Sequence, residues 1–272
     1  MSSTDKVFAG SIPKIYDAYL VPLIFEHYAA DLAQRLKGRR LSSVLEIAAG
    51  TGVVTRALAS TLPESTAIVA TDLNQAMLDQ ASAAGTRRAV EWRLADAMLL
   101  PFEDATFDAV VCQFGVMFFP DKVKAYSEVH RVLRPGGIFI FNVWGSIEEN
   151  EFADVVTIAL ESVFPKDPPR FMARTPHGYH DPAQIARDLA KAGFVAEPRI
   201  DTVTARSRAE SPREPAVAFC QGTPLRSEIE ARDAARLDEA TDVATEAIAR
   251  RFGRGAVDGK MQAHIITIQA GG

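Results

Sequence analysis

Between residues 43 and 144, short apolar runs alternate with segments whose apolar residues recur at helical spacing. The strand-like runs include SVLEIA, AIVATD and IFIFNVW, and the helix-like runs include VVTRALASTL, NQAMLDQASAAG and DKVKAYSEVHRVLRPGG. This alternation predicts parallel strands joined by right-handed crossovers, which form an open α/β sheet with helices on both faces. Ligands of such sheets bind beyond the carboxyl ends of the strands. Residues at those ends are therefore the first candidates for a functional site.

Length and composition limit the class of protein. The 272 residues can bury a core as one large domain, or as one domain with an added segment. Apolar residues make up 47% and charged residues 24% of the chain, which is ordinary for a soluble globular protein. A net charge of −5 at pH 7 does not give the broad positive surface that nucleic-acid binding needs. We therefore expect no nucleic-acid partner.

The sequence also predicts a compartment. The start, MSSTDKVFAG, lacks the pattern of a secretory leader. No run reaches the ~20 apolar residues that a membrane-spanning helix needs. The two distant cysteines, Cys112 and Cys220, are typical of free thiols in a reducing environment. We expect a cytoplasmic protein with no membrane partner, and the oligomeric state is left open.

Outside residues 43–144 the pattern changes. The run at 12–38 predicts a helix that Pro22 kinks or divides. After about residue 146, helical and proline-rich stretches are too long for plain connections and predict a mainly helical cap. Four segments are expected: an N-terminal helical cap segment at 1–41, a ligand-binding core at 42–145, a helical and loop lid at 146–193, and C-terminal strands at 194–272 with a helical insertion at 207–260.

The first strand-like run leads into a loop of small residues, VLEIAAGTG at 44–52. Gly50 and Gly52 allow a tight turn and a close approach to a ligand, and the N-terminus of the next helix offers free N–H groups. A dinucleotide-binding loop needs G-x-G-x-x-G, but Thr55 stands where the third glycine would be. The pattern of a nucleoside triphosphate loop, G-x-x-x-x-G-K-[ST], is absent as well.

Glu46 lies inside this apolar run. A carboxylate at the end of a parallel strand would repel a pyrophosphate, but it suits a ligand that carries positive charge. S-adenosylmethionine has an ammonium group and a sulfonium centre and no phosphate. The alternative is a half-buried glutamate whose carboxylate is satisfied by backbone donors.

Two further acids follow later strands. Asp72 ends the second strand about 20 residues after Gly52, the offset at which an acid accepts hydrogen bonds from ribose hydroxyls. The alternative role for Asp72 is helix capping, although Asn74 already offers a cap. Asp96 ends the third strand and can accept from an exocyclic amine of adenine, with the N–H of Ala97 donating to a ring nitrogen. Together these acids predict an adenosine-containing ligand.

Four stretches of the chain resemble the successive motifs of class I S-adenosylmethionine-dependent methyltransferases. They are VLEIAAGTG, ATDLNQAML, LADAMLLPFEDATFDAVVCQF and EVHRVLRPGGIFIFNVW, in the family's order and spacing over residues 42–145. The most similar branch is the small-molecule branch that includes ubiquinone and menaquinone methyltransferases (methyltransferase type 11). The first glycine of the family's E/D-x-G-x-G-x-G loop is Ala48 here, which puts only the backbone angle at that position in question.

The resemblance implies a Rossmann-like, open, seven-stranded sheet, mostly parallel, with an antiparallel last strand supplied by AHIITIQA. It implies S-adenosyl-L-methionine as cofactor and S-adenosyl-L-homocysteine as product. Glu46, the backbone around Ala48 and Gly50, and the backbone carbonyl of Gln113 would hold the ammonium group. Asp72 would take the ribose hydroxyls, and Leu73 would pack against the adenine. Tyr16 would close over the sulfonium or serve as an ordinary packing residue. The expected cofactor-binding residues are Glu46, Ala48, Gly50, Gly52, Asp72, Leu73, Met77, Asp96, Ala97, Gln113, Phe114 and Tyr16.

Methyl transfer depends on alignment of the reacting atoms, so the sequence need not contain a catalytic side chain. If the acceptor is a hydroxyl or a protonated nitrogen, a general base helps, and the candidates are His177 and His180 in TPHGYHDP. Both histidines can equally be turn residues. No Cys/His cluster has metal-ligand spacing, so no structural zinc is expected.

The expected function is transfer of a methyl group to O, N or C of a small, partly hydrophobic or aromatic metabolite. The run FGVMFF at 114–119 can face such an acceptor or belong to the core. Two alternatives remain: a NAD(P)-dependent oxidoreductase on a similar sheet, and a protein that binds S-adenosylmethionine without transferring its methyl group.

Overall fold

The computed structural model describes residue 10 and residues 12–271, which pack into two compact units. The sheet unit comprises residues 26–143, 179–202 and 264–271, and the helical unit comprises the described residues up to Phe25 together with 144–178 and 203–263. The absence of a secretory leader was predicted from residues that, apart from Gly10, lie outside the described part of the chain. The four-segment organisation stays a prediction.

The seven strands form one sheet in the order β3-β2-β1-β4-β5-β7-β6, and the predicted α/β class is confirmed. The strands are β1 (Ser43–Ile47), β2 (Ala67–Asp72), β3 (Glu91–Leu94), β4 (Phe107–Gln113), β5 (Leu133–Trp144), β6 (Arg199–Ala209) and β7 (Val257–Gln269). β1 pairs in parallel with β2 and β4, β2 with β3, and β4 with β5. All these parallel strands therefore end at the same edge of the sheet.

β7 runs against β5, as the resemblance implied. Near the start of β5, Gly136 N–H donates to the Ala270 carbonyl at 3.1 Å, and near its end Gly145 N–H donates to the Gln262 carbonyl at 2.9 Å. Residue numbers therefore fall along β7 as they rise along β5, which is antiparallel pairing. Thr204 contacts Gln262 and Arg206 contacts Asp258, so β6 is also antiparallel to β7.

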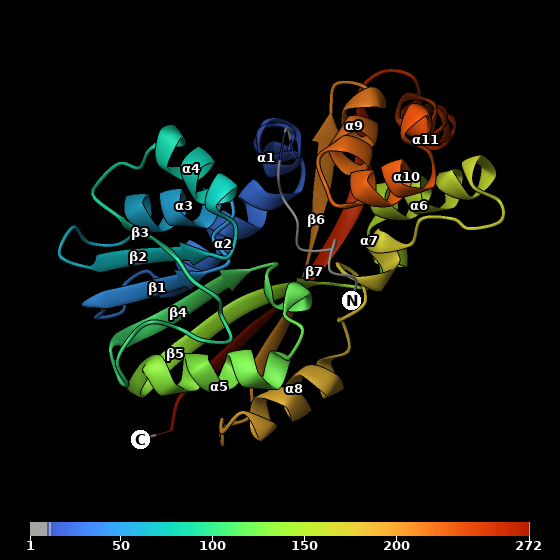
Figure 1. Ribbon diagram of the computed structural model, residues 1–272. Coiled ribbons are helices and arrows are strands. Elements are labelled where there is room, and N and C mark those ends of the chain that lie inside the picture. Colours follow the sequence, from blue (N-terminus) through green and yellow to red (C-terminus); the bar gives the residue numbers. More distant parts are fainter. Residues whose placement is uncertain (1–9, 11, 272) are drawn as a thin grey trace. The chain divides into compact units, whose positions relative to one another are not determined.

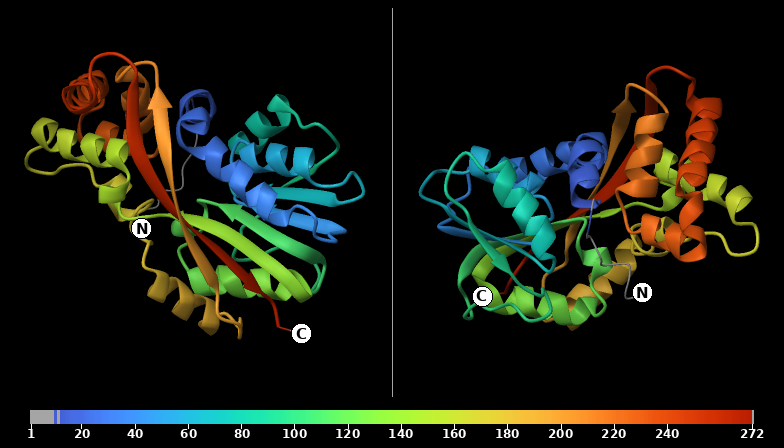
Figure 2. Two further views of the ribbon diagram at one scale, coloured as in Figure 1. Left: turned by 180° about the vertical axis from the view of Figure 1, so that it is seen from behind. Right: turned by 45° about the horizontal axis from the view of Figure 1, so that its top comes forward.

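Helices cover both faces of the sheet unit, as Figures 1 and 2 show. One face carries α2 (Glu26–Leu36), α3 (Val53–Thr61) and α4 (Gln75–Ala84), and the other carries α5 (Lys122–Val132) and α8 (Pro182–Lys191). The buried residues of α5 are Ala125, Tyr126, Val129 and Val132. This i, i+4, i+7 spacing places them on one stripe, which explains why this run packs as a helix against strands.

The helix predicted for DKVKAYSEVHRVLRPGG ends earlier than expected, because β5 begins at Leu133 and includes Pro135. Gly136 has a positive φ of 75° and its N–H bonds to Ala270. The last five residues of that run are therefore the start of a strand paired with the end of the chain near residue 270, which local sequence alone does not reveal.

The helical unit holds α1 (Ile12–Ile15), a π-helix at Tyr16–Phe25, α6 (Glu151–Val163), α7 (Phe171–Arg174), α9 (Arg213–Gln221), α10 (Leu225–Asp233) and α11 (Leu237–Phe252). Pro22 lies inside the π-helix. Proline lacks an N–H and disrupts the regular hydrogen bonds of an α-helix. The predicted interruption at Pro22 is therefore a stretch of π-helix, which has a wider turn. α9, α10 and α11 lie between β6 and β7 along the chain.

Candidate cofactor site

The loop after β1 turns through three left-handed residues. Ala48, Gly50 and Gly52 have φ values of 54°, 56° and 81°. Gly52 has a second reason to be glycine, since a Cβ there would lie 2.9 Å from the ring of Trp92 and 3.1 Å from Ala81. The turn brings the chain directly into α3, with Gly52 as the N-cap. The predicted tight strand-to-helix turn is therefore present, with an alanine in a conformation that usually requires glycine.

Glu46 points into the protein and is only 1% exposed. Its Oε2 accepts a hydrogen bond of 2.5 Å from the hydroxyl of Thr55. Burial raises the pKa of Glu46 to about 8, and the Thr55 bond only partly opposes this. Thr55 is the residue that stands in place of the third glycine of a dinucleotide loop. Glu46 and Thr55, the two residues that distinguish this turn from a dinucleotide-binding loop, are therefore hydrogen-bonded to each other.

Asp72, at the end of β2, lies against the same turn. One oxygen accepts the N–H of Gly50 at 2.8 Å, and the other accepts the N–H of Asn74 at 2.8 Å. Burial raises the pKa of Asp72, although these hydrogen bonds oppose the shift. Asp72 thus fixes the glycine loop and the start of α4 together, and its contact with a ribose stays a prediction.

The residues that follow Asp72 differ in exposure. Leu73 is 48% exposed, which is unusual for a leucine next to a buried acid, whereas Met77 is buried in α4. An exposed apolar side chain at the carboxyl ends of strands is suited to cover a flat ligand surface. The contact of Leu73 with the adenine stays a prediction, as does a role of Met77 in binding the cofactor.

Asp96 forms a tight turn after β3. Its Oδ1 accepts the N–H of Met98 at 2.9 Å, and its carbonyl accepts the N–H of Leu99 at 2.9 Å. Both Asp96 and Ala97 are partly exposed, as an adenine-recognising edge would need to be.

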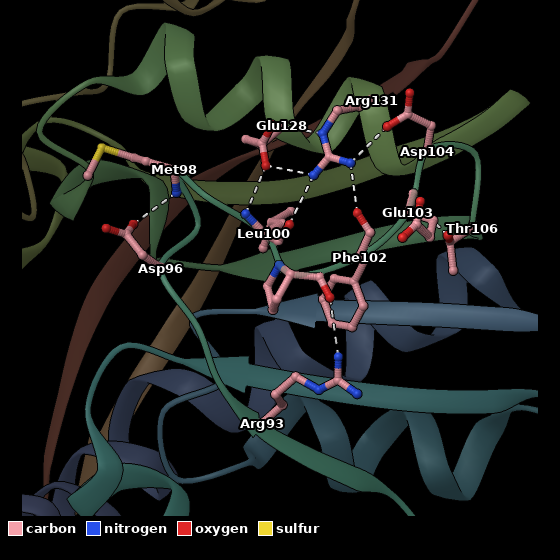
Figure 3. A network of polar contacts seen from close by, with 11 residues as sticks. Arg93, Asp96, Met98, Leu100, Phe102, Glu103, Asp104, Thr106, Glu128 and Arg131 are labelled. Carbon is pink, nitrogen blue, oxygen red and sulfur yellow. Dashed lines mark hydrogen bonds and ion pairs between the residues drawn. The ribbon is translucent and has the colours of Figure 1, made fainter.

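The loop that follows Asp96 is held by α5, as Figure 3 shows. Arg131 bonds to Glu128, to Asp104 and to the carbonyls of Leu100 and Phe102. Glu128 also accepts the N–H of Leu100 at 2.8 Å. The five-way contact of one guanidinium fixes the path of the loop from the end of β3 to the start of β4.

The loop at the end of β4 is held by a side chain of the neighbouring strand β5. Phe114 has a φ of 48°, and its N–H donates to Oδ1 of Asn142 on β5 at 2.8 Å. Register pairs Gln113 with Asn142, so the amide reaches across neighbouring strand ends. Within the run 114–119, Phe114, Met117 and Phe119 are buried. Most of this run therefore belongs to the core.

Two predicted residues lie in the helical unit. The ring of Tyr16 stacks on Phe25 with centroids 5.0 Å apart. Nδ1 of the buried His177 lies 2.9 Å from the carbonyl of Gly145, and because a carbonyl only accepts, Nδ1 carries the hydrogen. His177 lines a cavity of about 20 Å³ with Trp144 and nine other residues of this unit, room for a single water.

His180 lies in the sheet unit and is exposed. It neighbours His264, whose pKa is lowered by burial first and by the charge of His180 second. Nδ1 of His264 contacts the hydroxyl of Thr202 at 2.9 Å. The two histidines considered together as possible bases therefore fall in different units, one buried and one exposed.

The sequence reasoning missed Thr55 and Asn142. The signal for Thr55 was present, because a hydroxyl replaces an expected glycine one turn into the helix after a buried acid. No local signal marked Asn142, which acts across strands.

Cys112 and Cys220 are both buried free thiols. Within residue 10 and residues 12–271, no group of three His, Cys, Asp or Glu side chains could hold a metal ion. No helix in that range has the length and apolarity to cross a bilayer.

Comparison with known proteins gives the same picture for the core. The sequence model of the methyltransferase domain family (Methyltransf_11) matches residues 45–141. The ubiquinone/menaquinone biosynthesis C-methyltransferase UbiE of Escherichia coli is 38% identical over 103 residues, which are 36% of this chain and 41% of that protein. The chain thus spans about two fifths of the length of the curated relatives that it matches.

Solved structures share the fold over a longer range. The YcgJ protein of Bacillus subtilis superposes with a TM-score of 0.57 at 17% identity, over 90% of this chain and 99% of that chain. Phosphoethanolamine N-methyltransferase 2 of Haemonchus contortus, with S-adenosyl-L-methionine bound, has a TM-score of 0.60 at 16% identity, over 100% of this chain and 61% of that chain. Residues 45–141 therefore match the methyltransferase domain family, and the seven-stranded sheet around them is a fold that these solved structures share.

Proposed function

We propose that this protein is an S-adenosylmethionine-dependent methyltransferase that acts on O, N or C of a small, partly hydrophobic or aromatic metabolite. The observation that carries the proposal is the turn at 46–52. Its buried acid bonded to Thr55 takes the place of the pyrophosphate-binding geometry of a dinucleotide loop. A site with acids at neighbouring strand ends suits a ligand with positive charge and no phosphate.

The residues present fit this cofactor. Asp72 is buried beside the turn with its oxygens already aligned by two N–H groups, and a carboxylate oxygen can accept further bonds from ribose hydroxyls. Asp96 and Ala97 are accessible for the adenine edge, and Leu73 offers an exposed apolar face. The buried hydroxyl of Thr51, in the same turn, has no hydrogen-bond partner among the described residues. Buried polar side-chain atoms without a hydrogen-bond partner are rare in folded proteins.

When bound, S-adenosylmethionine supplies a methyl group on a positively charged sulfur that leaves as a neutral thioether. The residues of the protein then need only to bind and orient the reacting molecules. The turn and the end of β4 hold the amino-acid end, the acids of β2 and β3 hold the adenosine, and water is excluded from the reacting atoms. Such alignment is worth about 7–11 kcal/mol in favourable cases, so no covalent group from the protein is needed.

A general base is needed only for some acceptors. His177 has a defined tautomer, since Nδ1 donates to Gly145, and Nε2 of the neutral ring is then the nitrogen that can take a proton. His180 is exposed, whereas His177 is buried. We propose His177 as the first candidate for a base or an acceptor contact, and His180 as the second.

The names of the relatives support the class of reaction and leave the acceptor open. One name specifies a C-methyltransferase of ubiquinone and menaquinone biosynthesis and another a phosphoethanolamine N-methyltransferase. The acceptors in those names differ in size, charge and attacking atom, so the proposal for this chain stays at a small molecule. A cytoplasmic location without nucleic-acid or membrane partners is part of the same proposal.

Titration calorimetry with four ligands tests the proposal: S-adenosylmethionine, S-adenosylhomocysteine, NADH and NADPH. Binding of the first two alone supports it, whereas binding of a nicotinamide cofactor alone would replace it with the oxidoreductase alternative. Transfer of a labelled methyl group to a fractionated metabolite extract then separates an enzyme from a protein that only binds the cofactor.

A further inference from the structure

Three residues other than glycine have a left-handed backbone among the described residues: Ala48, Ala105 and Phe114. Two of them lie at the carboxyl ends of β1 and β4, which are neighbours in the sheet. Such a conformation is unfavourable for a residue with a Cβ and persists only where the surroundings enforce it. The two loops that border the predicted ammonium site therefore share one unusual feature.

Gly115 follows Phe114 and explains how the two loops meet. A Cβ added at Gly115 would lie 2.6 Å from the Cβ of Ala48 and 2.7 Å from Sγ of Cys112, both closer than real side chains approach. The φ of Gly115 is −99°, which any residue adopts. Glycine is therefore required at this position by space and not by backbone angle, and the methyl group of Ala48 occupies part of that space.

The loop after β4 is also fixed from its other side. Oδ1 of Asn142 accepts the N–H of Phe114, and Asn142 is fully buried. Phe114 is thus held by β5 on one side, while Gly115 packs against Ala48 on the other. The carbonyl of Gln113, predicted to face the ammonium group, lies directly before this clamped pair.

We propose that Ala48 and Gly115 are a matched pair of positioning residues. The methyl group of one and the missing side chain of the other set the spacing between the glycine loop and the loop after β4. This inference rests on the proposed function, because the two loops are those assigned to the amino-acid end of S-adenosylmethionine. Loops that are already ordered lose less conformational freedom when a ligand binds, so the pair raises affinity for the cofactor.

The contact itself is tested without any ligand, by a double-mutant cycle in thermal unfolding. Gly115→Ala overpacks the site and lowers the Tm by roughly 3–8 °C. In the background of Ala48→Gly one of the two clashes is removed, so we expect about half of that loss to be recovered. An equal loss of Tm in both backgrounds overturns the matched pair.

The positioning role is tested by binding of S-adenosylhomocysteine, with Ala105→Gly as the matched control. Ala105 has nearly the same left-handed φ as Ala48, 51° against 54°, but it is exposed and lies just before β4. Both variants relieve backbone strain, so neither loses Tm beyond about 2 °C.

Only Ala48→Gly weakens binding, by about 3–10-fold, because only it loosens the spacing. Wild-type affinity in Ala48→Gly overturns the positioning role and leaves the proposed function standing. Failure of the wild-type protein itself to bind removes the proposed function and the positioning role together, while the unfolding cycle still decides whether the two residues are coupled.

Discussion

At the two ends of the parallel strands in the sheet unit, the pKa values of acidic side chains are shifted in opposite directions. At the amino ends, Asp108 accepts N–H groups of Ser42 and Ser43 and pairs with Arg134 at 2.6 Å. Burial alone would raise the pKa of Asp108, but the bond to Arg134 and the two N–H groups lower it.

Glu128 belongs to the same end. Its hydrogen bonds to Arg131 lower its pKa despite partial burial. At the carboxyl ends the order is reversed, because burial dominates and raises the pKa of Glu46 and of Asp72.

We interpret this difference as a division between acids that stabilise the fold and acids that the proposed cofactor requires. A carboxylate beside a guanidinium is favourable in its charged form at neutral pH and contributes to stability. A buried carboxylate without such a partner opposes folding when it ionises. A positively charged ligand bound beside Glu46 and Asp72 would favour their ionised forms.

The largest effect is expected at the amino ends. Arg131→Ala removes five contacts and leaves the carbonyls of Leu100 and Phe102 and the carboxylate of Glu128 without their donor. We expect the free energy of unfolding to fall by about 2–3 kcal/mol in urea titrations. Arg187→Ala is the control, because its contact with Asp181 is 3.7 Å long and exposed and should cost no more than about 0.5 kcal/mol. An equal loss of unfolding free energy in the two variants would show that the hydrogen bonds of Arg131 do not stabilise the fold.

A reciprocal pair of variants comes next. Asp72→Ala should weaken binding of S-adenosylhomocysteine by about 1–3 kcal/mol, the scale of unmade buried hydrogen bonds. Asp108→Ala should lower stability and leave binding unchanged, since Asp108 serves the start of β1. Calorimetry and urea unfolding on both proteins give the four values. A loss of affinity in Asp108→Ala would contradict the division between the ends.

The third prediction concerns pH. Folded Glu46, with a pKa of about 8, holds its proton more tightly than the unfolded chain, where the usual value is 4.5. Its contribution to stability is therefore full below pH 4.5 and is lost as pH rises to about 8, with a slope of at most ~1.4 kcal/mol per pH unit. Asp108, with a lowered pKa, loses its contribution in the opposite direction, below pH 4.

Urea unfolding between pH 5 and pH 8 checks this prediction. The stability of Glu46→Gln should decline less with pH than that of the wild-type protein, because the carboxamide does not titrate. Superimposable profiles would show that Glu46 is already ionised in the folded protein at pH 5.

The smallest effect is expected at Leu73. Leu73→Ala should lower cofactor affinity about threefold to fivefold by loss of apolar contact, with little change in stability, because the side chain is 48% exposed. Val195→Ala, at an even more exposed apolar position of the sheet unit, should change neither quantity. If affinity is unchanged in Leu73→Ala, Leu73 has no place against the adenine.

Much of the core was predictable because its signals are local. The strand runs of β1, β2 and β4, the turn at 50–52 and the acids after the strands all follow from periodicity and residue type. The start of β5 was not predictable in this way, since Pro135 and the glycines around it read as the end of a helix. Their strand conformation depends on pairing with residues near 270, more than 130 positions away.

The same distinction applies to the candidate site. Glu46 and Asp72 were recognised from type and position, but their environment was not. The bond to Thr55, the N–H groups around Asp72 and the amide of Asn142 depend on how neighbouring strand ends meet. Exposure also resists prediction from sequence, because Leu73 and Met77 are similar in type and opposite in burial.

The hydrogen bond between Glu46 and Thr55 has a consequence for how this loop can change over evolutionary time. Changing Thr55 to glycine first strands a carboxyl group in the interior without its donor, and changing Glu46 first leaves a hydroxyl without its acceptor. Neither single step is neutral. The pair therefore acts as a barrier against a stepwise change of this turn into a pyrophosphate-binding loop.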